Sequence, residues 1–186
     1  MKIAYFHGFG SKFDPNNPKV VALSKLGEVV GVDVDYTNYA ADVVEIATMW
    51  VIKTSPDLIV GTSMGGWLAA DVGTLCGVPF VAINPSIKPS LTLAKHPSHG
   101  IDYAGREYEL PVEVVLSYSD ITIGGFGLVI VDRGDDVIDS YETTLHMEPS
   151  HYILAFEGGS HRFDHIEESL GAIKRFYNKA QVSYGS

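Results

Sequence analysis

Short apolar runs alternate with helix-length amphipathic segments along most of the chain, and this alternation limits the possible folds more than any other feature. The apolar runs are typical of strands, and the longer segments are typical of helices. Strands joined through helices pair in parallel, because each connection must return to the end of the sheet where the previous strand began. The sequence therefore predicts a compact α/β fold of three layers, with a mostly parallel central sheet and helices on both faces.

The expected strands follow from the short apolar runs, and the expected helices follow from the amphipathic segments. Residues 84–110 fit neither pattern. Prolines and polar residues there predict a loop-rich excursion over the carboxyl edge of the sheet. The segment Tyr118–Gly127 is compatible with either a hairpin or a loop. The expected strands are Lys2–Phe6, Val29–Val34, Leu58–Thr62, Phe80–Ile83, Val112–Leu116, Leu128–Val131 and Tyr152–Phe156. The expected helices are Pro18–Leu26, Asp42–Thr54, Gly65–Cys76, Ser90–Lys95, Val137–Leu145 and Asp164–Tyr177.

Composition narrows the class of protein further. The 186 residues are 46% hydrophobic and 19% charged and contain no repeat or linker, so we expect one globular domain. A net charge of −10 repels the phosphate backbone, so a nucleic-acid partner is not expected. No apolar stretch approaches the roughly 18 residues of a membrane span, and the first residues lack the pattern of a secretory signal. We therefore expect a cytoplasmic protein.

The strongest local motif is GTSMG at residues 61–65, which fits G-x-S-x-G. It stands directly after an expected strand and directly before an expected helix, where such a sharp turn is required. The turn strains the serine backbone, and side chains at Gly61 and Gly65 would collide with neighbouring elements. Ser63 would then project from the carboxyl edge of the sheet, where ligands bind in open α/β folds. We expect Ser63 to be a nucleophile.

A serine nucleophile needs a base, and His161 is the best candidate. It follows an apolar strand and a glycine pair and precedes the last helix, which is the place of the histidine in a Ser–acid–His chain order. His165 also comes late enough, but it is expected within the following helix. His161, Asp164 and His165 could instead be a metal cluster, yet their spacing fits one helix face poorly, so no metal is expected.

The remaining histidines have weaker arguments for a catalytic role. His146 and His151 flank a helix–strand junction and are expected at the surface. His96 and His99 lie in the loop-rich excursion, where contact with substrate is an alternative to a solvated position.

The acid that orients the histidine should follow the penultimate strand, where four aspartates compete. Asp135, just after a glycine, is the preferred candidate, because the acid must face the imidazole from this turn. Asp136 and Asp139 remain alternatives, and Asp139 could instead cap the next helix. A calcium loop would require an alternating ligand set and a closing glutamate, which the segment lacks.

An oxyanion hole needs two backbone N–H groups, one of them directly after the nucleophile. This assigns one donor to Met64 and the other to the glycine-rich turn HGFGS at residues 7–11, where Phe9 is the best candidate. His7 is expected to hold this turn by packing and hydrogen bonding and not to be the base. We also expect His7, Gly8 and Trp67 to contact substrate. The turn lacks the G-x-G-x-x-G spacing of a dinucleotide site, so no cofactor is expected.

Six motifs are distributed along nearly the whole chain. They are HGFGS at 7–11, GTSMGG at 61–66, NPSIKP at 84–89, YAGREYEL at 103–110, RGDDVIDSYE at 133–142 and EGGSHRF at 157–163. Together these motifs resemble the YqiA-like esterases, small members of the α/β-hydrolase superfamily. Methionine stands at position 64, where leucine is usual in that family, and serine stands at position 160, where asparagine is common.

The resemblance implies an α/β-hydrolase fold and a compact hydrolase that acts on carboxylic esters or acyl thioesters. It matches the catalytic triad of the family to Ser63, Asp135 and His161, and it makes residues 84–110 the cover of the active site. Two readings of other classes remain as alternatives, namely a catalytically silent protein of this fold that binds a small ligand or a partner. The oligomeric state is left open by the sequence.

Overall fold

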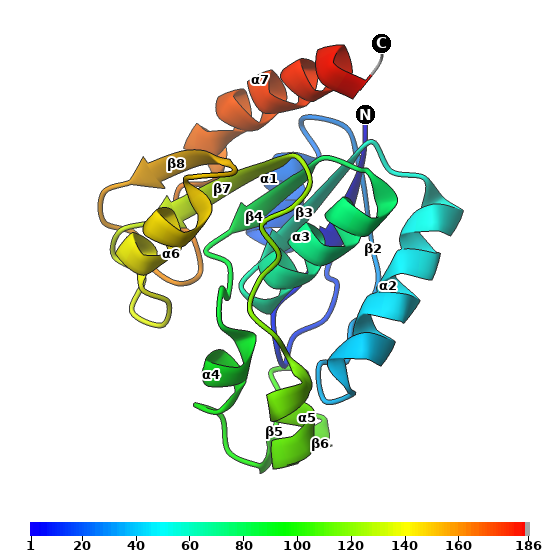
Figure 1. Ribbon diagram of the computed structural model, residues 1–186, viewed down its shortest axis with the longest axis vertical. Coiled ribbons are helices and arrows are strands. Elements are labelled where there is room, and N and C mark those ends of the chain that lie inside the picture. The colour runs from blue at the N-terminus through cyan, green and yellow to red at the C-terminus, as the bar shows by residue number, and fades with distance from the viewer. Residues whose placement is uncertain (185–186) are drawn as a thin grey trace.

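The computed structural model describes residues 1–184, and its central element is a six-stranded sheet whose strands are all parallel (Figure 1). The strand order is β2-β1-β3-β4-β7-β8. The predicted parallel sheet is therefore confirmed. Its strands are β1 (Lys2–Phe6), β2 (Glu28–Gly31), β3 (Leu58–Thr62), β4 (Phe80–Ile83), β7 (Gly127–Asp132) and β8 (Tyr152–Phe156).

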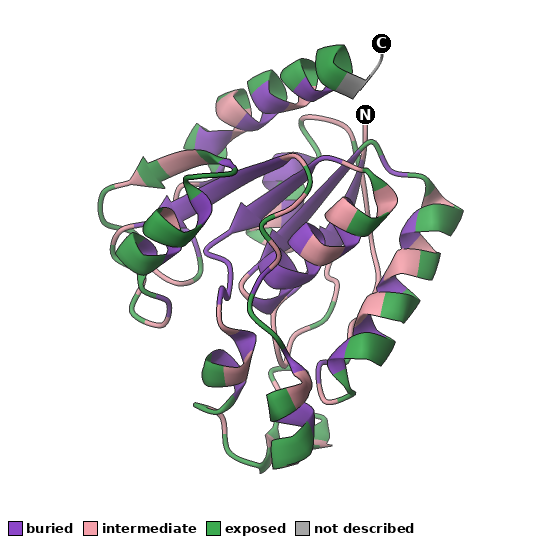
Figure 2. Cartoon of the chain, in the orientation of Figure 1, coloured by how far each residue is buried: buried purple, intermediate pink, exposed green. Residues whose placement is uncertain are grey.

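Helices cover both faces of the sheet because the strands are apolar on both faces. In β1, Ala4 and Phe6 pack in one hydrophobic cluster, whereas Ile3 and Tyr5 pack in the other. The first cluster includes residues of α2 (Ala40–Thr54), α3 (Met64–Cys76) and α6 (Ser140–Met147). The second includes residues of α1 (Pro18–Leu23) and α7 (Ile166–Tyr184). Figure 2 shows the resulting pattern, in which the inner strands β1, β3, β4 and β7 are buried and the helices are exposed on their outer sides. The edge strands β2 and β8 are partly exposed.

The chain between β4 and β7 leaves the sheet and forms a separate group of short elements beyond its carboxyl edge, low in Figure 1. The expected loop-rich excursion is thus partly ordered, with a helix and an antiparallel hairpin. The expected single domain covers residues 1–186, of which the last two lie outside the described residues. The short elements are α4 (Pro89–Leu93), β5 (His99–Ile101), β6 (Glu107–Glu109) and α5 (Val112–Ser117).

The prediction of a strand at Val112–Leu116 is wrong, since this segment is helix α5. Its β-branched composition favours a strand, but the segment lies off the sheet and has no neighbouring strand with which to pair. A helix satisfies the backbone groups locally instead. It buries Val114 and Val115, and the Ser117 hydroxyl donates to the Val114 carbonyl oxygen at 2.6 Å.

Several boundaries also differ from the expected ones. Strand β2 ends at Gly31 and not at Val34, because the Val34 N–H donates to His7 Nε2 at 2.8 Å and leaves the sheet ladder. Helix α7 begins at Ile166, so His165 precedes it and does not lie within it. The segment that was compatible with a hairpin or a loop, up to Phe126, is a loop. Within residues 1–184, no helix combines the length and hydrophobicity that crossing a lipid bilayer requires.

His151 is buried, so the prediction that it lies at the surface is wrong. Its side chain is 8% exposed and packs edge-on against Phe80, with ring centroids 5.4 Å apart. Gly127 makes room for it, since a Cβ there would lie 3.1 Å from His151 Nδ1. Neither ring nitrogen has a hydrogen-bond partner within the described residues. Burial therefore lowers the pKa of His151 below its ordinary value of 6.5.

This burial makes stability depend on pH. The folded state keeps His151 neutral, whereas the unfolded chain takes up a proton near pH 6.5. The stabilisation that the neutral ring provides is thus present above pH 6.5, and it is lost as the pH falls toward the lower pKa that His151 has in the folded state. We expect His151→Leu to reduce the loss of unfolding free energy between about pH 8 and pH 5, by at most about 1.4 kcal/mol per pH unit. Urea titrations of both proteins measure this, and parallel curves would contradict it.

Candidate active site

The candidate site lies where the order of the strands reverses direction. From β1 the chain first adds β2 on one side, and it then adds β3 and the later strands on the other. The carboxyl ends of β1 and β3 are therefore neighbours from which the connections diverge, which is where open α/β sheets bind ligands. Gly8 follows β1 and Ser63 follows β3, so the glycine-rich turn and the predicted nucleophile meet at this point.

Ser63 has a strained backbone, with φ of 56° and ψ of −119°. Residues with side chains rarely adopt a positive φ, so the surroundings must hold it. The neighbouring backbones approach very closely. A Cβ at Gly61 would lie 1.9 Å from the Gly65 carbonyl oxygen, and a Cβ at Gly65 would lie 2.1 Å from the Phe6 carbonyl oxygen. The expected collisions at these two glycines are thus confirmed.

Backbone hydrogen bonds also fix Ser63 in its turn. Its N–H donates to the Ile83 carbonyl oxygen at 3.0 Å, so the residue is tied to the end of β4. Its carbonyl oxygen accepts from the N–H of Ser86 at 3.1 Å and from the first turn of α3. The turn is therefore held from β4 as well as from β3 and α3.

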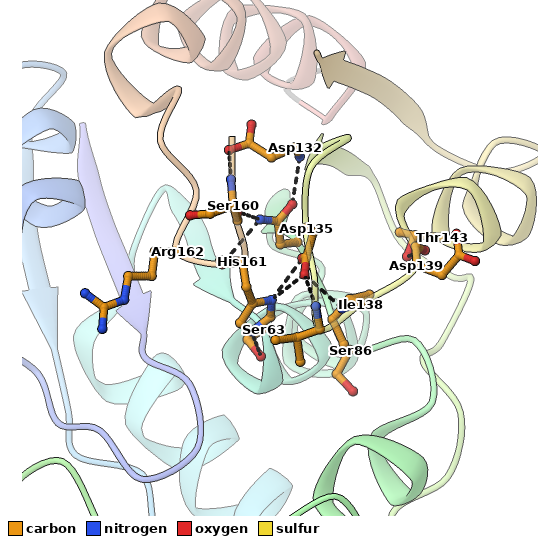
Figure 3. A network of polar contacts seen from close by, with 12 residues as sticks. Ser63, Ser86, Asp132, Asp135, Ile138, Asp139, Thr143, Ser160, His161 and Arg162 are labelled. Atoms are coloured by element: carbon orange, nitrogen blue, oxygen red, sulfur yellow. Dashed lines mark hydrogen bonds and ion pairs between the residues drawn. The ribbon is translucent and has the colours of Figure 1, made fainter. Parts of the chain in front are cut away.

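The structure brings Ser63, His161 and Asp135 together in one line of hydrogen bonds (Figure 3). His161 Nε2 lies 3.0 Å from Ser63 Oγ, and His161 Nδ1 lies 2.9 Å from Asp135 Oδ2. The imidazole is 23% exposed, whereas the Asp135 carboxylate is 1% exposed. A neutral imidazole that donates from Nδ1 to the carboxylate leaves Nε2 free to accept the serine proton.

Asp135 is held by its own turn. Its Oδ1 accepts from the N–H groups of Val137 and Ile138, each at 2.8 Å. The alternatives lie elsewhere, since Asp136 is exposed and the Asp139 carboxylate accepts from two N–H groups in the first turn of α6. Of the aspartates weighed from the sequence, Asp135 is the one that contacts His161.

His7 is held in a tautomer that excludes it as a base for Ser63. Its Nε2 accepts from the Val34 N–H, so the proton must reside on Nδ1, which donates to the Gly8 carbonyl oxygen at 2.8 Å. Burial lowers the pKa of His7 and so favours this neutral ring. The predicted structural role of His7 agrees with these contacts.

The turn after β1 lies directly against the serine. A Cβ at Gly8 would lie 3.4 Å from Ser63 Cβ and 3.9 Å from Ser63 Oγ, so Gly8 borders the candidate site. Met64 is the first residue of α3, so its N–H has no partner inside the helix. The two predicted oxyanion donors, Phe9 and Met64, thus belong to the two segments that meet at Ser63.

Trp67 does not occupy the position expected of a substrate contact. Its side chain is 1% exposed, and its indole N–H donates to the Ser119 carbonyl oxygen at 3.1 Å. It packs against Tyr118, with ring centroids 5.1 Å apart. Trp67 follows Ser63 by four residues, but on α3 it faces the core and helps to fix the helix.

The excursion beyond β4 packs on the glycine-rich turn. The Phe9 ring contacts His96 and Tyr108, with centroids 4.5 Å and 5.3 Å apart. The Tyr103 N–H donates to the Gly10 carbonyl oxygen at 2.9 Å. Burial and the nearby His161 lower the pKa of His96. The hairpin and the turn therefore adjoin the candidate site together.

Sequence reasoning missed a second polar cluster beside the first. Asp132, at the end of β7, is fully buried and lies 2.7 Å from His165 Nδ1. Asn84, at the end of β4, is 1% exposed and contacts the segment that carries His161. The available signal was the position of these polar residues at strand ends. His161 and His165 thus contact different aspartates and do not face a common point.

Two glycines in helices, one without room for a Cβ and one with room for it, provide a test of the Ser63 turn. Gly65→Ala is expected to destabilise the protein by at least about 1–3 kcal/mol, because its Cβ would overlap the Phe6 carbonyl oxygen. Gly171→Ala in α7 is the matched control, since its Cβ would meet nothing closer than 3.4 Å. There alanine should stabilise by about 0.5–1 kcal/mol. Thermal unfolding compares the variants, and a neutral Gly65→Ala would show that the close approach is not required.

Solved structures show the same fold. The chain is similar to Est1E from Butyrivibrio proteoclasticus, with a TM-score of 0.75 and 16% identity over 97% of this chain and 88% of that one. It is also similar to a monoacylglycerol lipase of Paleococcus ferrophilus, with a TM-score of 0.71 and 14% identity over 96% of this chain and 94% of the lipase. The predicted α/β-hydrolase fold is confirmed.

Sequence comparison places the chain within a family. A UPF0227 protein of Vibrio parahaemolyticus is 31% identical in an alignment of 186 positions, which covers 95% of this chain and 99% of that protein. A UPF0227 protein of Yersinia pseudotuberculosis is 26% identical over 94% of this chain and 97% of that protein. The model of the uncharacterised protein family UPF0227 matches residues 2–178. The chain therefore belongs to the UPF0227 family, the YqiA-like group that its motifs resemble.

Proposed function

We propose that this protein is a serine hydrolase that cleaves carboxylic esters or acyl thioesters through an acyl-enzyme on Ser63. The observation that carries the proposal is the line of hydrogen bonds from Ser63 Oγ through His161 to the buried Asp135 carboxylate. A serine in a strained strand-to-helix turn, followed along the chain by an acid and then by a histidine, supplies the parts that acyl transfer by this mechanism requires.

In the first half of the reaction, Ser63 Oγ attacks the acyl carbon while His161 Nε2 takes the hydroxyl proton. The carbonyl oxygen becomes an oxyanion, which the N–H groups of Phe9 and Met64 would stabilise. Asp135 accepts from Nδ1 and stabilises the imidazolium without taking its proton. The bond to the leaving oxygen or sulfur then breaks, and that atom takes the proton from His161 Nε2.

In the second half, water attacks the acyl-enzyme and gives a proton to His161 Nε2. The bond between the acyl carbon and Ser63 Oγ breaks, and the oxygen recovers that proton. The products are the carboxylic acid and the free alcohol or thiol. The histidine serves as base and then as acid in each half, so no group outside the chain is consumed.

The structural relatives support esters as the substrate class. Est1E has been solved with ferulic acid bound, and a monoacylglycerol lipase shares the fold. We propose that residues 84–110 form the cover of this site, because their aromatic side chains pack on Phe9. In the proposed site Gly8 borders the nucleophile, and Trp67 acts from the core by fixing α3.

Labelling with a fluorophosphonate probe tests whether Ser63 is activated. We expect stoichiometric modification of Ser63, located by mass spectrometry, because the probe reacts with serines whose proton a base removes. Ser63→Ala should abolish labelling, and His161→Ala should slow it by several orders of magnitude. His146→Ala, on the exposed side of α6, is the control and should label normally. An unlabelled but folded wild-type protein would favour the ligand-binding alternative.

Two of the aspartates in the segment after β7, Asp135 and Asp139, permit a matched test of the acid. Asp135 and Asp139 each accept two backbone N–H groups through Oδ1, but Asp135 alone contacts His161. Asp135→Asn should reduce kcat for a p-nitrophenyl ester by about 10³–10⁴-fold, because an amide does not hold the required tautomer. Asp139→Asn retains the helix cap and should leave kcat unchanged. Equal effects of the two substitutions would refute the assignment.

A further inference from the structure

We propose that Asn84 and Asp132 form a clamp that positions His161 through its backbone. This inference rests on the proposed function, since it assigns His161 its catalytic place. Neither side chain contacts Ser63 or Asp135, so both are positioning residues. Asn84 directly follows β4 and Asp132 ends β7, and both contact the segment after β8, which carries His161. Figure 3 shows Asp132 beside Ser160 of this segment.

The Asn84 carboxamide joins two strand ends to the histidine segment. Its Nδ2 donates to the carbonyl oxygens of Ser160 and His161, at 3.0 Å and 3.3 Å. Its Oδ1 accepts from the Asp132 N–H at 2.8 Å. The side chain is 1% exposed, so these bonds do not compete with water. The carbonyl of His161 is thus fixed relative to the end of the sheet.

The Asp132 carboxylate contacts N–H groups of the same segment, whereas Asn84 contacts its carbonyl groups. Its Oδ2 accepts from the N–H groups of Ser160 and Asp164, at 3.2 Å and 2.8 Å. Its Oδ1 accepts from His165 Nδ1 at 2.7 Å. This bond raises the pKa of His165, because a carboxylate favours the imidazolium. A fully buried carboxylate must find such partners, so it draws the whole segment against the end of β7.

The histidine segment needs such a restraint because its own backbone is permissive. Gly158 and Gly159 both have a positive φ, 72° and 73°, which glycine adopts at no steric cost. A Cβ at Gly159 would lie 1.9 Å from Asp132 Oδ2, so the segment passes too close to the carboxylate for a side chain at this position. The position of the imidazole therefore depends on side chains outside the segment.

Asn84 itself has a positive φ of 40°, which asparagine and glycine tolerate better than other residues. Asn84→Gly therefore removes the carboxamide without adding backbone strain. If the clamp positions His161, kcat for a p-nitrophenyl ester should fall about 10–100-fold while KM changes less than about 3-fold. Loss of stability alone would lower the melting temperature without this split between kcat and KM.

Proton NMR provides a readout that does not depend on activity. A proton shared between His161 Nδ1 and the buried Asp135 carboxylate resonates far downfield, and the Asp135→Asn spectrum distinguishes it from the His165 signal. We expect Asn84→Gly to shift or broaden the His161 signal. Asp132→Asn should act in the same direction by a smaller amount, since its oxygen still accepts. This second variant decides the question if Asn84→Gly does not fold.

Val129→Ala is the control for stability, because it removes a fully buried side chain of β7 outside the clamp. It should lower the melting temperature and leave both kcat and the His161 signal unchanged. An unaltered signal and unaltered kcat in the clamp variants would overturn the clamp and leave the serine hydrolase proposal intact. An inactive wild-type protein whose His161 signal still shifts in Asn84→Gly would overturn the proposed activity and support the clamp.

Discussion

The close approach of three backbones around Ser63 is the constraint on which the rest of the site depends. Gly61 and Gly65 allow β3, α3 and the end of β1 to meet with no room for a Cβ between them. This packing holds the positive φ of Ser63, which its side chain opposes. It also places Gly8 against the serine side chain, so that two segments distant in sequence form one surface. The position of Ser63 is therefore a property of the sheet and not of the serine turn alone.

Two aspartates three residues apart perform different tasks because strand β7 ends between them. Asp132 is the last residue of the strand, where its fully buried carboxylate collects backbone N–H groups and His165. Asp135 lies in the turn that follows, where its carboxylate reaches His161. The first carboxylate contacts the backbone of a segment, and the second contacts one imidazole. Figure 3 shows Asp132 beside Ser160 and Asp135 beside His161.

Local signals predicted the backbone geometry where it is decided within a few residues. The Gly–x–Ser–x–Gly turn carries its own steric argument, and the predicted collisions at Gly61 and Gly65 are present. The place of Asp135 in a turn was also a local signal, but the fold brings its carboxylate to His161. Local signals failed where burial is decided at a distance. His151 has a polar sequence context, yet it is buried because Gly127 leaves space beside Phe80. Similarly, α5 has a strand-forming sequence but no strand with which to pair.

The sequence by itself determined the parallel α/β fold, the family and the residues that could form a Ser–acid–His line, because periodicity and short motifs are local properties of the chain. Only the tertiary structure decided which polar side chains meet. Asn84, Asp132 and His161 come from three segments far apart in sequence, and their contacts exist because parallel strands bring their carboxyl ends to one edge. Trp67 shows the converse, since its proximity to Ser63 in sequence did not prevent its side chain from pointing into the core. The periodicity of the sequence does not predict such long-range contacts, because they depend on how strands and helices pack.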